Sequence, residues 1–259
     1  MEYKNLYING CSFTAGHTLD NEHRWSEILS SKLNTKLFNR ANNGQSMDSI
    51  FLNSILHLNK LTPEDTLVII GLTWTPRHGT IFNNSLFNIS PAHIERSTNY
   101  TESGFKSNNI VEATRRFAPT KLTYGDEEFK KERDIFLAKL KSFENLTVVM
   151  DKFIDYHRAL VKYQDEEVFM KNDRLNYISK VIALQSYLKE KKFNYKIIQF
   201  PYDFELFSDI DKTLVDEIDF NNVIKFHIGA SDLIFFRDES AHPTLEHNKI
   251  LVSRILESL

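Results

Sequence analysis

The alternation of strand-like and helix-like segments over the first 75 residues is the feature that most constrains the fold of this chain. Leu67 to Ile70 is an unbroken apolar run closed by Gly71, and a strand that is apolar on both faces is typical of a parallel sheet covered by helices on both sides. Strand-like segments at residues 6–8 and 36–41 precede it, separated by segments with apolar residues at helical spacing. The pattern therefore predicts a mainly parallel sheet.

A region from about residue 77 to 170 interrupts this alternation. Its first part, to about residue 121, is rich in Asn, Ser and Thr without a sustained period, and it is too long for an ordinary connection. We expect a functional loop, a lid or a small subdomain there, followed by charged helices at about 126–142 and 151–163. Beyond the insertion the chain predicts an amphipathic helix, a strand and a last helix, at about 173–191, 195–200 and 245–259. We expect one domain over residues 1–259 with this insertion.

The composition fits one large α/β domain and argues against several classes of partner. At 259 residues, 41% of them hydrophobic, the chain is long enough to bury a sizeable core. The formal net charge of -3 gives no basic field that would attract nucleic acid or an anionic membrane. Cys11 is the only cysteine, so no internal disulfide can form. With no signal-like segment and no long apolar run, we expect a cytoplasmic protein that does not bind membranes.

Ser12 is the first candidate for chemistry. It follows the first strand directly after Asn9-Gly10, where a glycine permits the tight turn that exposes a following side chain. Ligands bind at the carboxyl ends of the strands in a parallel sheet. The alternative is that Ser12 and Thr14 only cap a loop or the next helix.

A base and a carboxylate stand near the far end of the chain. His242 precedes Pro243 and the last helix, and Glu239 and Asp238 lie three and four residues before it. A serine nucleophile needs a base, and the base needs an orienting carboxylate. The alternative is a polar loop that happens to contain a histidine.

These segments resemble the four short sequence blocks of the SGNH, or GDSL-type, hydrolase family, in the same order along the chain. The first block resembles Gly10-Cys11-Ser12, in a Cys-Ser-Phe-Thr variant with Cys11 in place of the usual aspartate. The second is a glycine after the second strand, here Gly44. The third is Gly-x-Asn-Asp, which resembles Gly71-Leu72-Thr73-Trp74, and the last is Asp-x-x-His-Pro, which resembles residues 239–243. His247 stands where many members carry a further histidine.

The resemblance implies a fold and a catalytic mechanism. The fold would be a flavodoxin-like three-layer α/β/α sandwich around a mainly parallel sheet of about five strands, the SGNH hydrolase fold. Ser12 would attack an ester carbonyl, His242 would take and return the proton, and Glu239, or alternatively Asp238, would orient the imidazole. The backbone N–H groups of Ser12 and Gly44 would form the oxyanion hole with a side chain from the third block.

Thr73 departs from the pattern that the resemblance implies. The family's side-chain donor at that position is an amide, whereas Thr73 offers a shorter hydroxyl. Loss of one oxyanion donor typically costs on the order of 100- to 1000-fold in rate. Either Thr73 or Thr75 substitutes, or the enzyme is slow, or the protein is not a hydrolase.

Several other side chains are candidates for binding the substrate. Arg77 follows the third block and would favour a carboxylate or phosphate on the substrate, unless it forms a surface salt bridge. Trp74 and Trp25 offer rings that stack on a sugar, but Trp25 lies on an apolar helix stripe that predicts a core position. Cys11 as an alternative nucleophile conflicts with its predicted packing beside a strand end.

No metal or cofactor is expected. His17 and His23, with Asp20 and Glu22 between them, have a spacing that matches neither one helix face nor a familiar zinc motif. The sequence also contains no glycine-rich phosphate loop and no dinucleotide fingerprint.

The expected function is serine esterase or lipase-type hydrolysis of a small-molecule or carbohydrate ester, and the favoured substrate carries a small acyl group such as acetyl on a carbohydrate. Two alternatives remain open. One is an O-acyltransferase that excludes water from the second step. The other is a binding or structural protein that keeps the fold without efficient chemistry. The sequence does not indicate the oligomeric state.

Overall fold

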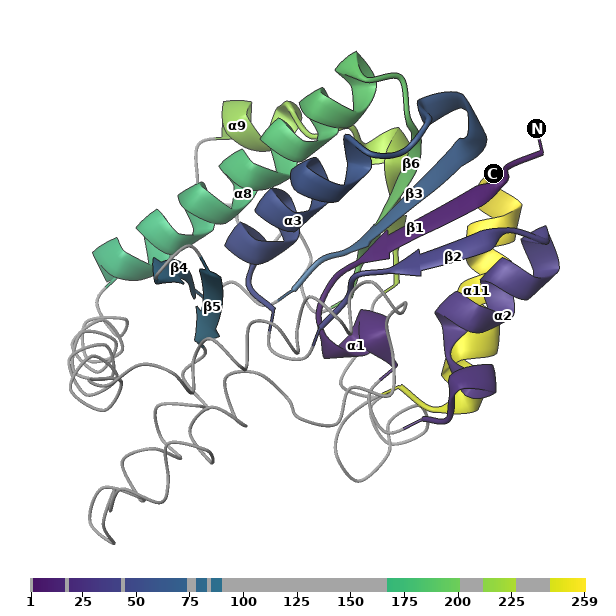
Figure 1. The fold of residues 1–259 in the computed structure, drawn as a ribbon. Helices are drawn as coiled ribbons and strands as arrows, with labels where there is room; N and C mark the ends of the chain where they lie inside the picture. Colours follow the sequence, from purple (N-terminus) through teal and green to yellow (C-terminus); the bar gives the residue numbers. More distant parts are fainter. Residues whose placement is uncertain are drawn as a thin grey trace, which may run out of the picture.

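The computed structural model describes residues 2–16, 19–42, 45–73, 78–82, 85–89, 167–200, 212–226 and 243–259, with only the backbone described for 78–82, 85–89 and 167–170. A parallel sheet with strand order β2-β1-β3-β6-β7 forms its centre (Figure 1). The strands are β1 (Asn5–Asn9), β2 (Lys36–Asn39), β3 (Thr66–Gly71), β6 (Asn194–Gln199) and β7 (Val223–Lys225). The central strand β3 is buried over its whole length, as its continuous apolar run predicts.

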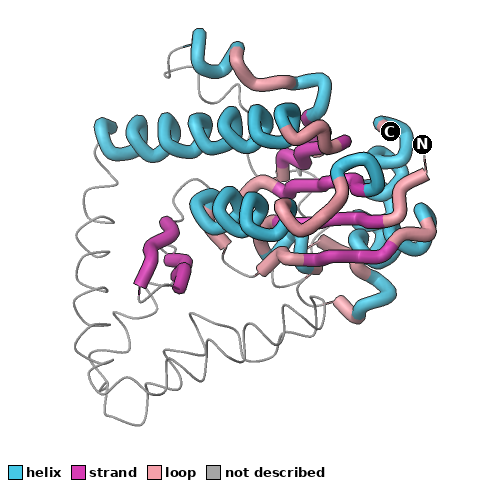
Figure 2. The backbone as a smooth tube through the Cα atoms, turned by 45° about the horizontal axis from the view of Figure 1, so that its top comes forward, coloured by secondary structure: helices cyan, strands magenta, loops and turns pink. Residues whose placement is uncertain are grey.

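Helices cover both faces of this sheet, which makes three layers (Figure 2). One face carries α3 (Met47–Leu58) and α8 (Glu167–Glu190), and the other carries α2 (Trp25–Leu33) and α11 (Leu245–Ser258). The remaining elements are α1 (Ser12–Ala15), α9 (Lys212–Asp216), the 3-10 turns η1 (Asn21–His23), η2 (Pro63–Asp65) and η5 (Phe220–Asn222), and the antiparallel pair β4 (His78–Phe82) and β5 (Ser85–Ile89).

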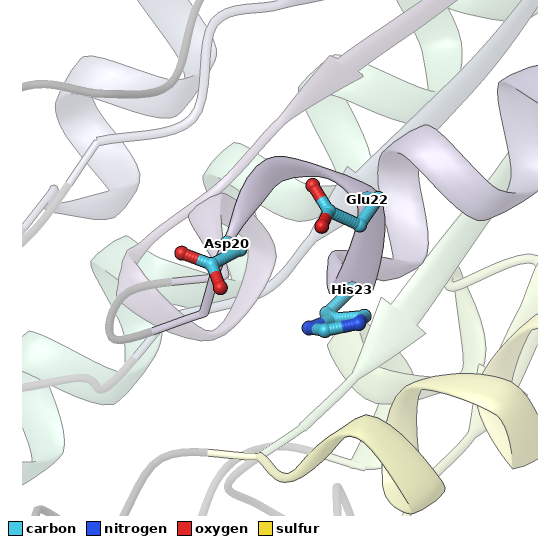
Figure 3. A group of neighbouring side chains, drawn as sticks. All are labelled: Asp20, Glu22 and His23. Carbon is cyan, nitrogen blue, oxygen red and sulfur yellow. The ribbon is translucent and has the colours of Figure 1, made fainter.

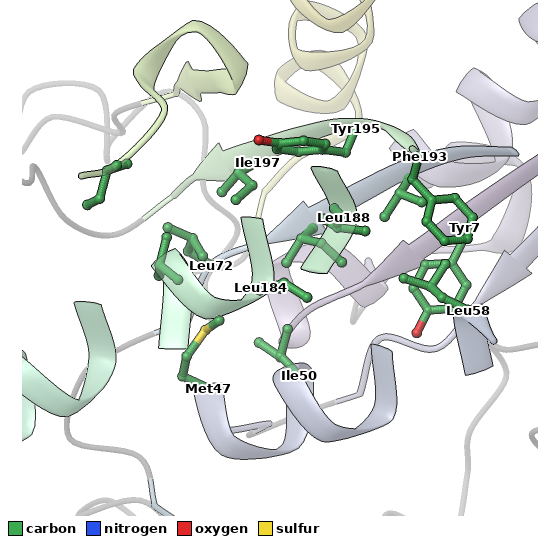
Figure 4. Packing of buried hydrophobic residues seen from close by; sticks show 14 of the residues in the cluster. Tyr7, Met47, Ile50, Leu58, Leu72, Leu184, Leu188, Phe193, Tyr195 and Ile197 are labelled. Carbon is green, nitrogen blue, oxygen red and sulfur yellow. The ribbon is translucent and has the colours of Figure 1, made fainter. Parts of the chain in front are cut away.

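Two hydrophobic cores result, one on each face of the sheet. Val68 and Ile70 of β3 belong to the first core with α3 and α8, whereas Leu67 and Ile69 belong to the second with α2 and α11. Figure 4 shows part of the first core, with Ile50 of α3 near Leu184 of α8. This alternation follows from the pleat of a strand, which sends successive side chains to opposite faces. Trp25 is fully buried in the second core, as its helix stripe predicts.

The fold class expected from the sequence is confirmed: the described residues form an α/β/α sandwich around a parallel sheet of five strands. Two strand details differ from the expectation. Within the region expected to form a loop, a lid or a small subdomain, β4 and β5 pair as antiparallel strands, which the sequence did not predict individually. The strand β7 was missed because its three residues are too few to show a period.

The helix expected at 173–191 begins earlier, at Glu167. The helices expected at about 126–142 and 151–163, and most of the insertion at 77–170, lie outside the described residues. Among the helices of the described ranges, none is long and apolar enough to cross a membrane.

Candidate active site

The short helix α1 lies at the carboxyl edge of the sheet (Figure 1), and Ser12 is its first residue. The strand β1 ends at Asn9, which pairs with Ile70 near the end of β3. The turns that follow these two neighbouring strands therefore lie at the same edge. Ser12 retains 7% exposure, whereas the preceding residue Cys11 is completely buried in the second core. The expectation that Cys11 packs inward is confirmed.

Hydrogen bonds fix the turn that carries Ser12. The side-chain oxygen of Asn9 accepts from the Gly10 N–H at 2.9 Å, and its Nδ2 donates to Ser54 Oγ at 3.0 Å on α3. The carbonyl of Cys11 accepts from the N–H groups of Thr14 and Ala15 at 3.0 and 2.9 Å. These contacts tie the end of β1 to α3 and set the direction of the short helix.

Thr14 packs α1 directly onto the ends of two strands. A Cβ atom added to Gly10 or to Gly71 would collide with the Thr14 hydroxyl. The close approach therefore requires glycine at both positions. Thr14 is fully buried, and among the residues that the structure describes its Oγ1 finds no hydrogen-bond partner. The distance between Ser12 and the sheet depends on this contact.

The loop after β2 runs beside the Ser12 turn. The Asn42 N–H donates to the Gly10 carbonyl at 3.0 Å, and the Ser46 side chain caps α3 by accepting from the Ser49 N–H at 3.3 Å. Gly44, the second expected oxyanion donor, stands between these two residues in the sequence but lies outside the described residues. Its role remains a prediction.

Thr73 follows β3 by two residues, at the same carboxyl edge as Ser12. It is fully buried, and its carbonyl accepts a hydrogen bond from the Tyr177 hydroxyl of α8 at 2.9 Å. Its role as an oxyanion donor remains a prediction. Trp74, Thr75 and Arg77 lie outside the described residues.

A row of aromatic rings connects the Ser12 turn with the start of α11. Phe13 lies 5.9 Å from Phe200, Phe200 lies 6.4 Å from Phe226, and Phe226 stacks on His247 at 4.5 Å, all between ring centroids. Phe200 follows β6, Phe226 follows β7, and His247 belongs to the first turn of α11. The row therefore spans the carboxyl edge from the residue after Ser12 to the start of the last helix. The sequence analysis missed Phe200 and Phe226, because only the sheet order reveals that they are neighbours.

The start of α11 is also anchored by polar contacts. The Thr244 hydroxyl caps the helix by accepting from the His247 N–H at 3.4 Å. Asn248 donates from Nδ2 to the carbonyl of His23 at 3.0 Å, a residue 225 positions earlier in the chain. His242, Glu239 and Asp238 precede this helix and lie outside the described residues. Their assignments as base and acid remain predictions.

Asp20, Glu22 and His23 lie together on the turn before α2 (Figure 3). One ligand atom from each lies within 4.8 Å of the others. Both carboxylates are exposed, and His23 is half-buried. These residues are close neighbours in the chain on a single turn, which accounts for their proximity, and His17 lies outside the described residues. The expectation of no metal remains a prediction.

The sequence and the structure were compared with known proteins. No protein-family model matches the sequence, and no curated protein matches it. The structure is similar to TesA, with a TM-score of 0.46, 11% identity and coverage of 99% of this chain and 98% of TesA. It is similar to the psychrotrophic esterase EstA from Pseudoalteromonas sp., with a TM-score of 0.45, 13% identity and coverage of 98% and 96%.

A member of the lipolytic protein G-D-S-L family from Veillonella parvula is also similar, with a TM-score of 0.41, 11% identity and coverage of 98% and 97%. The lipolytic G-D-S-L family is also the family that the sequence blocks resemble.

Proposed function

We propose that this protein is a serine esterase of the SGNH type, which hydrolyses a small acyl group such as acetyl from a carbohydrate through an acyl-enzyme at Ser12. The observation that carries the proposal is the aromatic row from Phe13 to His247. It brings the start of α11, which follows the expected base in the sequence, to the sheet edge where Ser12 begins α1. The Ser12 turn and the start of α11 thereby share one edge, which supports a base supplied by the residues just before that helix.

The proposed reaction has two steps. His242 takes the proton of the Ser12 hydroxyl while Oγ bonds to the ester carbonyl carbon, and the collapse of the tetrahedral intermediate expels the alcohol, which receives that proton. Water then attacks the acyl-enzyme with His242 again as base, and this releases the acid and restores Ser12. Glu239, or Asp238 in its place, holds the imidazole. The N–H groups of Ser12 and Gly44 and the hydroxyl of Thr73 stabilise the negative oxygen.

A fluorophosphonate probe tests the nucleophile. We expect the probe to label the wild type and to leave Ser12→Ala unlabelled, because the probe reacts only with an activated serine. Ser30→Ala is the matched control, since Ser30 is also 7% exposed but lies on α2 and donates to the Thr35 carbonyl at 2.8 Å. This variant should label like the wild type. A folded wild-type sample that stays unlabelled contradicts the assignment of Ser12.

Hydrolysis of 4-nitrophenyl acetate tests the base. We expect His242→Ala to lose at least about 1000-fold in kcat, in line with the loss of a triad member. Activity that survives this substitution contradicts the proposed mechanism.

The side chain of Thr73 favours two alternative functions on the same fold. It offers a hydroxyl where the family resemblance implies an amide donor. If hydrolysis is weak for that reason, the protein would serve as an O-acyltransferase or as a binding protein. Acyl transfer to a sugar acceptor that exceeds hydrolysis would favour the transferase. Saturable sugar binding without labelling at Ser12 would favour the binding protein.

A further inference from the structure

Arg24 is a buried arginine that binds the segment between α1 and α2. It directly precedes α2 and is only 2% exposed. Its Nε donates to the carbonyls of Gly16 and Leu19 at 3.3 and 3.1 Å, and its Nη2 donates to the Leu19 carbonyl at 2.8 Å. Its Nη1 donates to the side-chain oxygen of Asn21. A buried charge destabilises a fold unless hydrogen bonds compensate it, so these acceptors hold the guanidinium in one place.

One of these contacts reaches the short helix that carries Ser12. Gly16 ends α1, and its N–H donates to the Ser12 carbonyl. Its own carbonyl accepts from Arg24. The Cβ, Cγ and Cδ atoms of Arg24 occupy the space beside Gly16 where a larger residue would place its side chain. The guanidinium therefore holds the end of α1, and Gly16 alone stands between it and Ser12 in this series of hydrogen bonds.

The residue before Arg24 is held from the other side by α11. Asn248 is 1% exposed, and its Nδ2 donates to the His23 carbonyl at 3.0 Å. His23 is the last residue of η1, the turn drawn in Figure 3. Asn248 follows the expected base, His242, by six residues in the sequence. The same turn is thus bound to the helix of the nucleophile through Arg24 and to the helix after the base through Asn248.

Backbone hydrogen bonds make this turn a firm connection. The Leu19 N–H donates to the Gly16 carbonyl at 3.2 Å. The Arg24 carbonyl accepts from the N–H groups of Glu27 and Ile28 at 3.1 and 3.0 Å, which anchors Arg24 to the first turn of α2. Because α2 packs in the second core, Arg24 holds Gly16 from a fixed part of the fold.

The geometry of these contacts predicts an effect on catalysis. A nucleophile that is misplaced by about 1 Å can lose on the order of 100-fold in rate. We propose that Arg24 is a positioning residue, which fixes Ser12 relative to the residues just before α11. It acts through Gly16 and the turn η1, without contact with the substrate. This inference rests on the proposed esterase function.

Substitution of Arg24 by Met tests this role, because Met keeps an apolar stem beside Gly16 and removes the guanidinium. With 4-nitrophenyl acetate we expect kcat to fall about 10- to 100-fold, since Ser12 is displaced. The KM should change less than about threefold, because Arg24 does not bind the substrate. The rate of labelling by the fluorophosphonate probe should fall by a similar factor as kcat, since the probe reacts with the same serine.

Arg24→Lys is the conservative variant, and it also serves if the Met variant folds poorly. An ammonium keeps the charge but lacks the planar fork that reaches several acceptors at once. We therefore expect a kcat between those of the wild type and Arg24→Met, at least about threefold below the wild type. A wild-type kcat in Arg24→Lys would show that charge alone suffices and would contradict positioning by hydrogen bonds.

Asn248→Leu tests the other side of the turn. It should also lower kcat more than KM, because the His23 carbonyl loses its link to α11. In a double-mutant cycle with Arg24→Met, the two losses in log kcat should be less than additive, since either substitution releases the same turn. Strictly additive losses would show two independent contacts and contradict a shared connection.

Gln185→Met is the matched control for a loss of stability. Gln185 is also 2% exposed, and it exchanges hydrogen bonds with the backbone of Asp219 at 3.1 and 2.9 Å on the face covered by α8. Its substitution should lower the melting temperature, because the Asp219 groups lose their partners. At a temperature where the variant is folded, its kcat should equal that of the wild type.

The outcomes separate this inference from the proposed function. A wild type that is labelled at Ser12, together with an equal labelling rate and kcat in folded Arg24→Met, would overturn the positioning role and leave the esterase in place. Equal losses of kcat in Arg24→Met and Gln185→Met would show a purely structural effect. A folded wild type that neither reacts with the probe nor hydrolyses the ester would overturn the esterase proposal, and this inference with it.

Discussion

The contact between Thr14 and the ends of two strands sets the position of Ser12. The threonine side chain occupies the space that glycine leaves at residues 10 and 71. Because those glycines come from different strands, one small side chain determines how closely α1 approaches both β1 and β3.

Gly71→Ala tests this contact. The new methyl group would collide with the Thr14 hydroxyl and would lie 2.8 Å from Phe200 Cε2. We expect a loss of about 1–3 kcal/mol in the free energy of unfolding, which is typical of overpacking. Urea denaturation of the four proteins in a double-mutant cycle with Thr14→Ala measures the coupling. The double variant should recover part of the loss, and strictly additive effects would contradict the proposed clash.

Single residues differ in how far the sequence predicts their place. The inward packing of Cys11 follows from its apolar character beside a strand, and the structure confirms it. The role of Thr14 does not follow, because it depends on Gly71, which only the pairing of β1 with β3 brings near.

At the scale of elements, Asp219 joins α8, β6 and η5 through one carboxylate. Its Oδ2 interacts with Lys189 Nζ at 2.9 Å and accepts from Asn222 Nδ2 at 3.0 Å and Tyr195 Oη at 3.3 Å. The hydrogen bond from Lys189 is the main cause that lowers the pKa of Asp219 below its ordinary value of 3.8. Burial, followed by the negative charge of Asp219, raises the pKa of Tyr195 above its ordinary value of 10.0.

These two pKa shifts predict losses of stability at opposite ends of the pH range. The lowered pKa of Asp219 contributes stability above about pH 3.8 that is lost as the pH falls through the folded value. The raised pKa of Tyr195 contributes stability below about pH 10.0 that is lost as the pH rises toward its folded value. In urea titrations across this range, Asp219→Asn should lose less stability than the wild type on acidification, and Tyr195→Phe less on alkalinisation. Parallel curves for variant and wild type would contradict this linkage.

The elements themselves were predictable in proportion to their length. The strands β1, β2, β3 and β6 show apolar runs that the sequence reveals, and the helix α3 begins at its expected cap, Ser46. The short strand β7 carries too few residues for a pattern. It becomes a strand because the end of β6 offers it a hydrogen-bonding partner, a tertiary effect.

At the scale of the whole molecule, one sheet is shared by two cores, so the two faces should unfold together. Leu184 of α8 lies in the first core and Ile255 of α11 in the second, and both are fully buried. Each substitution to alanine should lower the free energy of unfolding by about 2–5 kcal/mol. Leu56→Ala is the control, because Leu56 is 62% exposed and should change little.

Coincident unfolding curves from fluorescence and circular dichroism would verify the shared transition. Separate transitions for the two alanine variants would show that the faces unfold independently.

The α/β/α sandwich was predictable from the sequence, because the spacing of apolar residues distinguishes buried strands from helices that cover a sheet. The candidate site was predictable only in its residue types. That the Ser12 turn and the start of α11 lie at one edge depends on strand order, since β6 and β7 bring Phe200 and Phe226 between Ser12 and His247. No local pattern records such an order, because it arises from contacts across more than 200 positions, such as Asn248 with His23.

The brevity of the outer strands affects how copies of this protein behave in concentrated solution. In the described sheet, β2 spans four residues and β7 three, and each strand has a lysine at one end, Lys36 and Lys225. An exposed edge strand has unpaired backbone N–H and C=O groups that can pair with a strand of another chain. A short edge strand with a charged lysine at its end makes such pairing less favourable. These borders therefore oppose aggregation by strand exchange, and the molecule can keep its sheet open without closing it into a barrel.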